Sequence, residues 1–349
     1  MTSSTSTPTS PSSSTAAPGP NPPIETVRYD GVNKLPADLL EWPSTEPSTA
    51  PSTIVLFIPG NPGLVHYYTA FLSTIHSNLH QTKSTIYALG HLDHSTHAKV
   101  RFTSRGVPGL REQIEHKVAF IDELKKKYPT IGVGKDAKTK MVLIAHSIGS
   151  HISCECIKAR PSLISSAILL FPTISHMALT PNGRRLWPLF SPLGLAPVGL
   201  STALLSYLPR ESLSRVVGRL SGQSDPGSLV TTGLVTSPGS VIAALTMARE
   251  EMRDVTDLDV EMLKKYGDRL CWYWARGDDD GWVLPSSVQE IEQVLDQAGF
   301  AKERRKKCEE GMQHAFILTT THSDSLAIRC AAWVADHIAE RKLDRFGQT

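Results

Sequence analysis

The chain has 349 residues, 40% of them hydrophobic, and a formal net charge of +2. This length and apolar content allow a sizeable core in one large domain or two small ones. The near-neutral charge gives no electrostatic basis for nucleic-acid binding, and five scattered cysteines do not form a disulfide framework. We therefore expect a globular protein of a reducing compartment.

The first 23 residues are almost entirely Ser, Thr, Pro, Ala and Gly. Such a segment cannot bury enough apolar surface to order itself, so we expect a disordered tail. It lacks the basic start and apolar run of a signal peptide, and without arginine it is a poor mitochondrial presequence. These features predict a protein of the cytosol or of a cytosolic surface.

The first strong strand is predicted at residues 53–58, after a short edge strand at 25–30. The strand segment, Thr-Ile-Val-Leu-Phe-Ile, is rich in β-branched residues and ends at Pro59-Gly60-Asn61-Pro62-Gly63. A Gly-rich turn exposes backbone N–H groups at the carboxyl end of the strand. Such turns are common, so a turn without function is the simpler alternative.

A helix at 66–79 and a strand at 84–89 are expected next, and then a loop with three histidines. His91, His94 and His97 have the spacing of metal ligands, but the loop is polar and has no nearby Cys or Glu. We favour a surface or gate loop over a metal site.

Residues 110–128 follow as an amphipathic helix, with His116 at the boundary of its apolar stripe.

Residues 141–149, Met-Val-Leu-Ile-Ala-His-Ser-Ile-Gly, are predicted to be a buried strand that turns sharply into a helix at Ser147. In a nucleophile elbow, the residues two before and two after the serine must be small. Here they are Ala145 and Gly149, whereas the usual pattern has glycine at both. An ordinary strand-to-helix connection is the alternative. Cys154 and Cys156 follow without a second pair, which favours core or surface residues over a metal site.

A further buried strand is predicted at 166–171. Strands and helices therefore alternate along the chain, which is typical of a parallel α/β sheet. Residues 186–209 then carry no charge and are flanked by Arg185 and Arg210. Four prolines argue against a full membrane span. Two compatible interpretations are a lid of short helices over an acyl pocket and a surface that dips into a lipid monolayer. A buried helical insertion without a substrate role is the third.

The strand expected at 268–275 leads into three adjacent aspartates, of which Asp280 is the best candidate for the acid of a catalytic triad. The chain order Ser, Asp, His of this architecture leaves only histidines beyond that position. His322 and His337 belong to a terminal helix and its start, so His314 is the best base. An acidic turn or cation site is the alternative for the aspartates, and the run 302–307 resembles a solvated helix face.

Together these residues predict nucleophilic catalysis at the carboxyl end of the sheet. Ser147 would attack, His314 would carry the proton and Asp280 would orient the imidazole. Backbone N–H groups would stabilise the oxyanion. The candidates for this role are Ile148, Gly60 and Asn61. We expect no metal and no cofactor.

The motifs Pro59-Gly60-Asn61-Pro62-Gly63, His146-Ser147-Ile148-Gly149-Ser150, Asp280-Gly281-Trp282 and His314-Ala315-Phe316 together resemble the lipid droplet-associated hydrolase family of the α/β-hydrolase superfamily. The resemblance covers roughly residues 50–343. It implies Ser147 as nucleophile, Asp280 as acid and His314 as base. It also implies residence on lipid droplets and lipid esters, such as sterol esters or acylglycerols, as substrates.

We therefore expect an α/β-hydrolase fold in four parts: a tail at 1–23, core segments at 24–172 and 264–343, and a cap or lipid-association insertion at 173–263. The expected function is hydrolysis of lipid esters on the cytosolic face of lipid droplets, with the endoplasmic reticulum as a second location. The alternatives are a droplet-binding scaffold with little turnover, and a thioesterase or short-chain esterase.

Overall fold

The computed structural model describes residues 22–30, 34–46, 49–97, 106–134, 137–223, 225–277 and 279–346. The predicted tail therefore lies outside the described residues except for its last two positions. In the described part of the chain, eight strands form one sheet. They are β1 (Ile24–Asp30), β2 (Leu35–Trp42), β3 (Thr53–Ile58), β4 (Ser84–Leu89), β5 (Lys140–His146), β6 (Ile164–Leu170), β7 (Leu270–Trp274) and β8 (Arg305–Lys307).

The α-helices occupy most of the remaining described chain. They are α1 (Thr69–Asn78), α2 (Leu110–Lys127), α3 (Ile148–Ala159), α4 (Pro181–Phe190), α5 (Pro192–Leu205), α6 (Arg210–Ser221), α7 (Asp225–Val235), α8 (Pro238–Asp254), α9 (Val260–Tyr266), α10 (Pro285–Gln297) and α11 (Thr320–Phe346). A short 3₁₀ helix, η1 (Val65–Tyr68), precedes α1. The terminal helix expected at the end of the chain is present as α11 and contains both His322 and His337.

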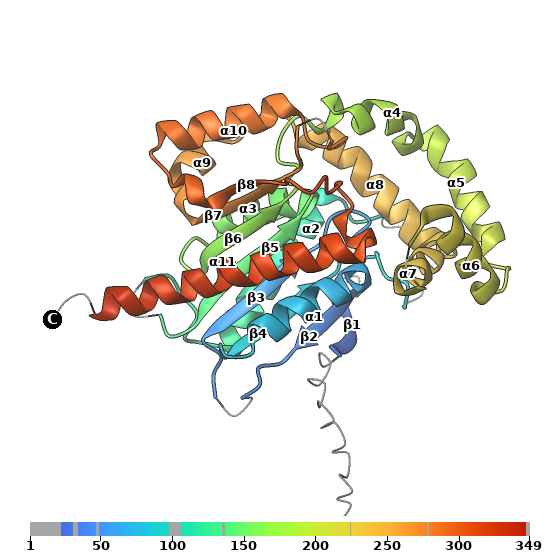
Figure 1. Ribbon diagram of the computed structural model, residues 1–349. Helices are drawn as coiled ribbons and strands as arrows, with labels where there is room; N and C mark the ends of the chain where they lie inside the picture. The colour runs from blue at the N-terminus through green and yellow to red at the C-terminus, as the bar shows by residue number, and fades with distance from the viewer. Residues whose placement is uncertain are drawn as a thin grey trace, which may run out of the picture.

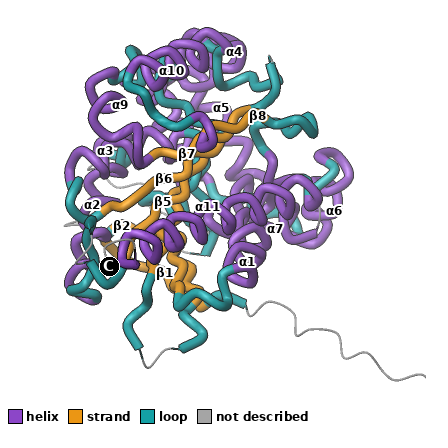
Figure 2. Tube along the Cα trace, turned by 60° about the vertical axis from the view of Figure 1, so that its left-hand side comes forward, coloured by secondary structure: helices purple, strands orange, loops and turns teal. Residues whose placement is uncertain are grey.

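The sheet has the order β1-β2-β4-β3-β5-β6-β7-β8, and all its pairs from β4 to β8 are parallel. Only β1 with β2 and β2 with β4 run antiparallel. Helices α1 and α11 cover one face, and α2, α3, α9 and α10 lie on the other (Figures 1 and 2). Right-handed crossovers between parallel strands place helices on both faces in this way.

The core consists of two apolar layers separated by the sheet. Successive residues of β3 alternate between the layers: Ile54 and Leu56 pack toward α2 and α3, while Val55 and Phe57 pack toward α1 and α11. All four are fully buried. This explains why the central strands are continuous apolar runs rather than alternating patterns.

Two strands did not follow from the sequence. β2 contains Pro36 and the buried Asp38, which obscure its strand pattern, although Leu39 and Leu40 face the core layers. The interpretation of 302–307 as a solvated helix face was wrong, because Arg305 to Lys307 form the parallel edge strand β8. The exposed side chains of Lys306 and Lys307 protect that edge from pairing with another chain.

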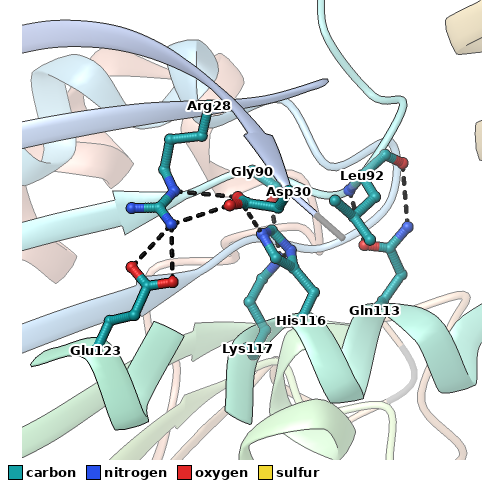
Figure 3. Close-up of polar contacts among 8 residues, drawn as sticks. All are labelled: Arg28, Asp30, Gly90, Leu92, Gln113, His116, Lys117 and Glu123. Atoms are coloured by element: carbon teal, nitrogen blue, oxygen red, sulfur yellow. Dashed lines mark hydrogen bonds and ion pairs between the residues drawn. The ribbon is translucent and has the colours of Figure 1, made fainter. Parts of the chain in front are cut away.

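A buried lysine joins α2 to the sheet (Figure 3). The Lys117 ammonium donates to the carbonyl of Gly90 at 2.6 Å and lies 3.1 Å from His116 Nδ1. His116 Nε2 lies 3.0 Å from Asp30 Oδ2, so the network reaches the edge strand β1. Burial lowers the pKa of Lys117 to about 7. His116 is thus buried in a polar network rather than placed at the margin of an amphipathic stripe.

All five cysteines are buried thiols, and none forms a disulfide. Cys154 and Cys156 lie in α3, and burial raises the pKa of both thiols. Their interpretation as structural residues agrees with this placement.

Helices α4 to α8, which follow β6, lie beyond one end of the sheet (Figure 1). Pro192 begins α5 and Pro209 directly precedes α6, so two of the four prolines interrupt helices as expected. Pro188 and Pro197 instead lie inside α4 and α5, where each removes one backbone donor. Within the described ranges, no single helix is both long and apolar enough to cross a membrane.

Candidate active site

Ser147 occupies a strained turn between β5 and α3. Its backbone has φ 54° and ψ −127°, outside the regions that a non-glycine residue ordinarily adopts. An added Cβ at Gly149 would lie 2.4 Å from the carbonyl oxygen of Ile58 and 2.8 Å from that of Pro59. Glycine is therefore required there for α3 to pass β3 closely, as the elbow pattern predicted.

Ala145 takes the place of the first glycine of the usual pattern. It is fully buried in β5, where it pairs with Ile58 of β3 and Leu169 of β6. The extra methyl group belongs to the apolar layer on the α3 side of the sheet. The departure from glycine is thus accommodated by the core.

Ser147, His314 and Asp280 come from three separate segments and meet at the carboxyl end of the sheet. The Ser147 Oγ lies 2.8 Å from His314 Nε2, and His314 Nδ1 lies 2.9 Å from Asp280 Oδ2. The backbone N–H of Trp282 donates to Asp280 Oδ1 at 2.8 Å, which fixes the carboxylate. Asp280 is buried, and His314 is partly exposed. With its proton on Nδ1, His314 can accept a proton from Ser147.

The turn after β3 packs directly against the serine. An added Cβ at Gly60 would lie 2.8 Å from Ser147 Cβ, so only glycine fits there. The Asn61 side chain donates to the carbonyl of Ala244 and to Glu251 Oε1, each at 2.8 Å. Ile148 begins α3, and the first N–H groups of a helix have no intrahelical acceptor.

His146 and Tyr68 form a second hydrogen-bonded chain that sequence reasoning missed. His146 Nε2 lies 2.9 Å from the carbonyl oxygen of His314, and its Nδ1 lies 2.7 Å from the Tyr68 hydroxyl. Burial keeps the pKa of His146 well below its usual value, so the ring is neutral and can donate from Nε2. Burial also raises the pKa of Tyr68, although the nearby backbone of Gly60 acts to lower it. These two hydrogen bonds thus connect η1, which contains Tyr68, to the loop that contains His314, through the residue before Ser147.

A cavity of about 480 Å³ opens beside Ser147 and His314. Its walls come from η1, from the loop after His314 and from helices α4, α7 and α8, and they include Leu186, Phe190 and Leu234. The size lies within the ~300–1,000 Å³ typical of small-molecule sites. The predominantly apolar walls suit a hydrocarbon chain.

Glu251 is an acidic group in this apolar wall, and sequence reasoning also missed it. Its side chain is buried, and burial raises the pKa of its carboxyl to about 7 even though Asn61 donates a hydrogen bond to it. Glu251 lies on α8, so it joins this helix to the turn after β3. No local pattern distinguishes it from the adjacent Glu250.

The loop with three histidines differs from its predicted form. His91 and His94 are fully buried, which contradicts a surface loop, and their ring centroids lie 5.5 Å apart. His97 is half exposed and instead packs against His66, with ring centroids 4.2 Å apart. The polar sequence suggested a surface loop, but a histidine can be buried when its imidazole is neutral. Burial lowers the pKa of His94 to about 4, so its ring is neutral in the interior.

Comparison with known proteins identifies the family. The model of the lipid-droplet associated hydrolases matches residues 51–317. This chain belongs to the lipid-droplet associated hydrolase family. The resemblance seen in the sequence motifs is thereby confirmed, and the coarse activity of the family is that of a hydrolase.

Relatives named lipid droplet-associated hydrolase match most of the chain. The protein from Gallus gallus is 32% identical over 310 residues, which cover 84% of this chain and 88% of the relative. The Mus musculus relative is 26% identical and covers 81% and 85%. The one from Drosophila melanogaster is 27% identical and covers 88% and 98%. This member of the lipid-droplet associated hydrolases therefore aligns with most of the length of these relatives.

Solved structures show the same fold at low identity. A thermostable carboxyl esterase from Bacillus coagulans aligns with a TM-score of 0.55 at 15% identity, over 91% of this chain and 99% of the esterase. The haloalkane dehalogenase DatA from Agrobacterium tumefaciens aligns with a TM-score of 0.59 at 12% identity, over 91% and 98%. The α/β-hydrolase fold expected for the lipid-droplet associated hydrolase is thus confirmed.

Proposed function

We propose that this protein is a serine hydrolase that cleaves carboxylic esters of lipids without a cofactor. The observation that carries the proposal is the hydrogen-bonded series from Ser147 through His314 to Asp280 at the mouth of an apolar cavity. A nucleophile, a base and an orienting carboxylate in this geometry are suited to acyl transfer.

In the first half of the reaction, Ser147 Oγ attacks the ester carbonyl while His314 Nε2 takes the serine proton. The Asp280 carboxylate holds the imidazole in the correct tautomer and stabilises the imidazolium. The tetrahedral intermediate then collapses, and His314 returns the proton to the departing alcohol. In the second half, His314 activates a water molecule that hydrolyses the acyl-enzyme and regenerates Ser147.

The oxyanion requires backbone N–H groups that do not already donate to another acceptor. The Gly60 backbone lies near the buried Tyr68 hydroxyl and acts on its pKa, so we place Gly60 last among the three donors predicted from the sequence. We assign the role to the N–H groups of Ile148, at the start of α3, and of Asn61. The Asn61 side chain is held by Ala244 and Glu251, which would keep its backbone in place.

The cap helices support a lipid substrate and a lipid surface. Leu193 is 89% exposed, Tyr207 87% and Leu220 84%, and these residues lie on and between α5 and α6, away from the core. Arg210, Arg215 and other exposed arginines accompany them. Such an apolar and basic surface can enter a monolayer of anionic or zwitterionic lipids. We therefore propose that 173–263 forms both the roof of the cavity and the contact with the droplet.

The first test is reaction of the purified protein with a fluorophosphonate probe. We expect Ser147→Ala and His314→Ala to lose labelling, because the first removes the nucleophile and the second its base. Ser150→Ala is a matched control, since Ser150 is a buried serine three residues further along the same turn and helix. Circular dichroism of each variant would verify the fold.

Labelling of Ser147→Ala to the wild-type extent would overturn the nucleophile assignment. Absence of labelling in folded wild-type protein, with and without added lipid droplets, would overturn the hydrolase mechanism. Labelling only when droplets are present would show that the cap closes the site in solution. A hydrolysis assay with acylglycerols, sterol esters and thioesters would then define the substrate.

A second candidate function is droplet binding with little turnover, which the exposed apolar cap also favours. This function predicts that Ser147→Ala leaves lipid storage in cells unchanged. It also predicts that changes in the cap abolish localisation. A storage defect in the Ser147→Ala variant with normal localisation would reject it.

A further inference from the structure

A cluster of histidines and carboxylates lies apart from the Ser147 site. Glu25 of β1, His66 of η1 and His97 after β4 offer ligand atoms that all lie within 4.8 Å of one another. A cavity of about 220 Å³ is lined by these three residues together with Thr26, Val27 and Asp38. The cluster joins segments that are distant in sequence and brings three potential ligands around one space.

Asp38 points to a ligand independently of that spacing. Its side chain is 2% exposed, and its Oδ2 atom has no hydrogen-bond partner. This oxygen lies 3.6 Å from His66 Nδ1 and 3.7 Å from His97 Nδ1, while Ser95 donates to the other oxygen at 2.6 Å. His66 Nδ1 is also buried and unpartnered. Buried polar atoms without partners are costly and require an explanation.

We propose that Glu25, His66 and His97 bind a divalent transition metal ion, with Zn²⁺ as the best match. Two imidazoles and one carboxylate are an ordinary zinc ligand set, with a fourth position left for water. Tetrahedral zinc with bonds of ~2.1 Å places its ligand atoms roughly 3.4 Å apart. His66 Nε2 and Glu25 Oε2 are 3.7 Å apart, which is close to this value.

Asp38 completes the site as an outer partner. A carboxylate beside Nδ1 of a metal-binding histidine holds the proton on that nitrogen and leaves Nε2 for the metal. Asp38 Oδ2 faces Nδ1 of both His66 and His97 at 3.6 and 3.7 Å, so a small shift of the rings toward a bound ion would bring it within hydrogen-bond distance.

The site would connect the edge of the sheet to the turn beside Ser147. His66 lies in η1, which begins two residues after that turn, and Glu25 lies on the outermost strand. An ion would therefore tie β1, η1 and the loop after β4 together without contacting the serine. Its expected role is structural, as a clamp on the segment that follows the turn.

The experiment is a zinc titration of the untagged full-length protein after treatment with a chelator, with binding followed by calorimetry and unfolding by thermal melting. We expect one equivalent of Zn²⁺ bound with micromolar or tighter affinity, and a higher melting temperature with zinc. His97→Gln and Glu25→Gln should each weaken binding at least tenfold. Both residues are substantially exposed, so these variants are expected to fold. His80→Gln, which changes another exposed histidine, is the control.

Wild-type affinity in both His97→Gln and Glu25→Gln would place the metal elsewhere and overturn the proposal. The same conclusion would follow if the wild-type protein bound no zinc at 100 μM, roughly a hundredfold above the expected dissociation constant. Equal weakening by His80→Gln would show nonspecific binding to surface histidines and would also overturn it. Fluorophosphonate labelling should be retained in every variant, so the fate of this proposal is separate from that of the hydrolase mechanism.

Discussion

The central sheet and the cap helices α5 and α6 are both rich in apolar residues, but the sheet buries these side chains and the cap exposes many of them. Ile54, Leu56 and Leu143 are fully buried between helical layers, whereas Leu193 is 89% and Leu220 84% exposed. In the sheet, the central strands β3 and β5 have neighbours on both sides and helices on both faces. In the cap, Pro192 begins α5 and Pro209 precedes α6, so this part of the chain forms short helices that cannot cover one another fully.

This contrast separates two requirements of the proposed lipid hydrolase. Catalysis needs groups held rigidly, and the buried sheet would provide that for the proposed catalytic residues Ser147 and Asp280. Contact with lipid needs apolar surface on the outside, which a soluble core would normally hide. If the division holds, changes in the sheet should affect chemistry and changes in the cap should affect binding to lipid. The following experiments test this division.

The largest effect is expected from Asp280→Asn. The amide cannot stabilise an imidazolium and favours the wrong tautomer of His314, so kcat should fall about 10⁴-fold. Sedimentation with lipid vesicles should be unchanged. Asp279→Asn is the matched control, because Asp279 is the adjacent aspartate and is exposed, whereas Asp280 is buried against His314. If Asp279→Asn lost as much activity as Asp280→Asn, the acid would be wrongly assigned.

A smaller effect is expected at Glu251, where the cap meets the sheet. A carboxyl with a folded pKa of about 7 and an unfolded pKa of 4.5 makes the folded state less stable as pH rises through this window. The expected loss is about 3 kcal/mol between pH 4.5 and pH 7. Glu251→Gln should remove this loss and be more stable than wild type at pH 8, as measured by urea unfolding at pH 5 and pH 8.

Glu250→Gln serves as the control for this prediction. Glu250 is the neighbouring residue, and its carboxylate accepts a hydrogen bond from the backbone of Leu110. That variant should keep the wild-type pH dependence. Identical pH dependence in Glu251→Gln and wild type would show that another group carries it.

The combined change Leu193→Ser, Leu200→Ser and Leu204→Ser tests the cap directly. Each leucine is more than 60% exposed, so folding should be little affected. Binding to phospholipid-coated droplets should weaken at least about tenfold, since each leucine that enters the lipid contributes up to ~2 kcal/mol. Turnover of a soluble short-chain ester should be preserved.

A matched control makes the same kind of change outside the cap. Val133→Ser with Ile328→Ser removes exposed apolar side chains from other surfaces, at 39% and 55% exposure. Droplet binding should survive in this control. Equal weakening in the two sets would show that general surface hydrophobicity, rather than the cap, controls binding.

The smallest effect is expected from Ala145→Gly, which restores the usual elbow pattern. Loss of one buried methyl group and greater freedom of the unfolded chain should lower the free energy of unfolding by about 1 kcal/mol. Activity should change less than threefold, because Ala145 already fits between β3 and β6. A large gain in activity would mean that the methyl group distorts the elbow.

Local signals in the sequence were sufficient for the central fold and for selecting three residues that the structure brings together. The strands 53–58 and 84–89 were predicted with the bounds observed, because buried parallel strands are unbroken apolar runs that end at turns. Ser147, Asp280 and His314 were selected from turn residues and chain order, and the structure brings them within hydrogen-bonding distance.

The remaining features depend on tertiary contacts that no local pattern encodes. Glu251 becomes distinctive only because α8 packs over the turn that contains Asn61. His97 was grouped with His91 and His94 by sequence spacing, but its neighbour in space is His66. The strand β2 escaped notice because Asp38, a polar residue, occupies a buried position. Sequence spacing describes neighbours along a segment and not neighbours across segments.

The burial of every native cysteine makes the protein suitable for site-specific labelling. Cys154, Cys156 and Cys330 are buried thiols with raised pKa values, so they should react slowly with maleimides in the folded state. A single cysteine placed at 193 or 220 would then be the fast-reacting thiol. An environment-sensitive dye attached at that position would change its fluorescence when the helix moves from water into the lipid surface.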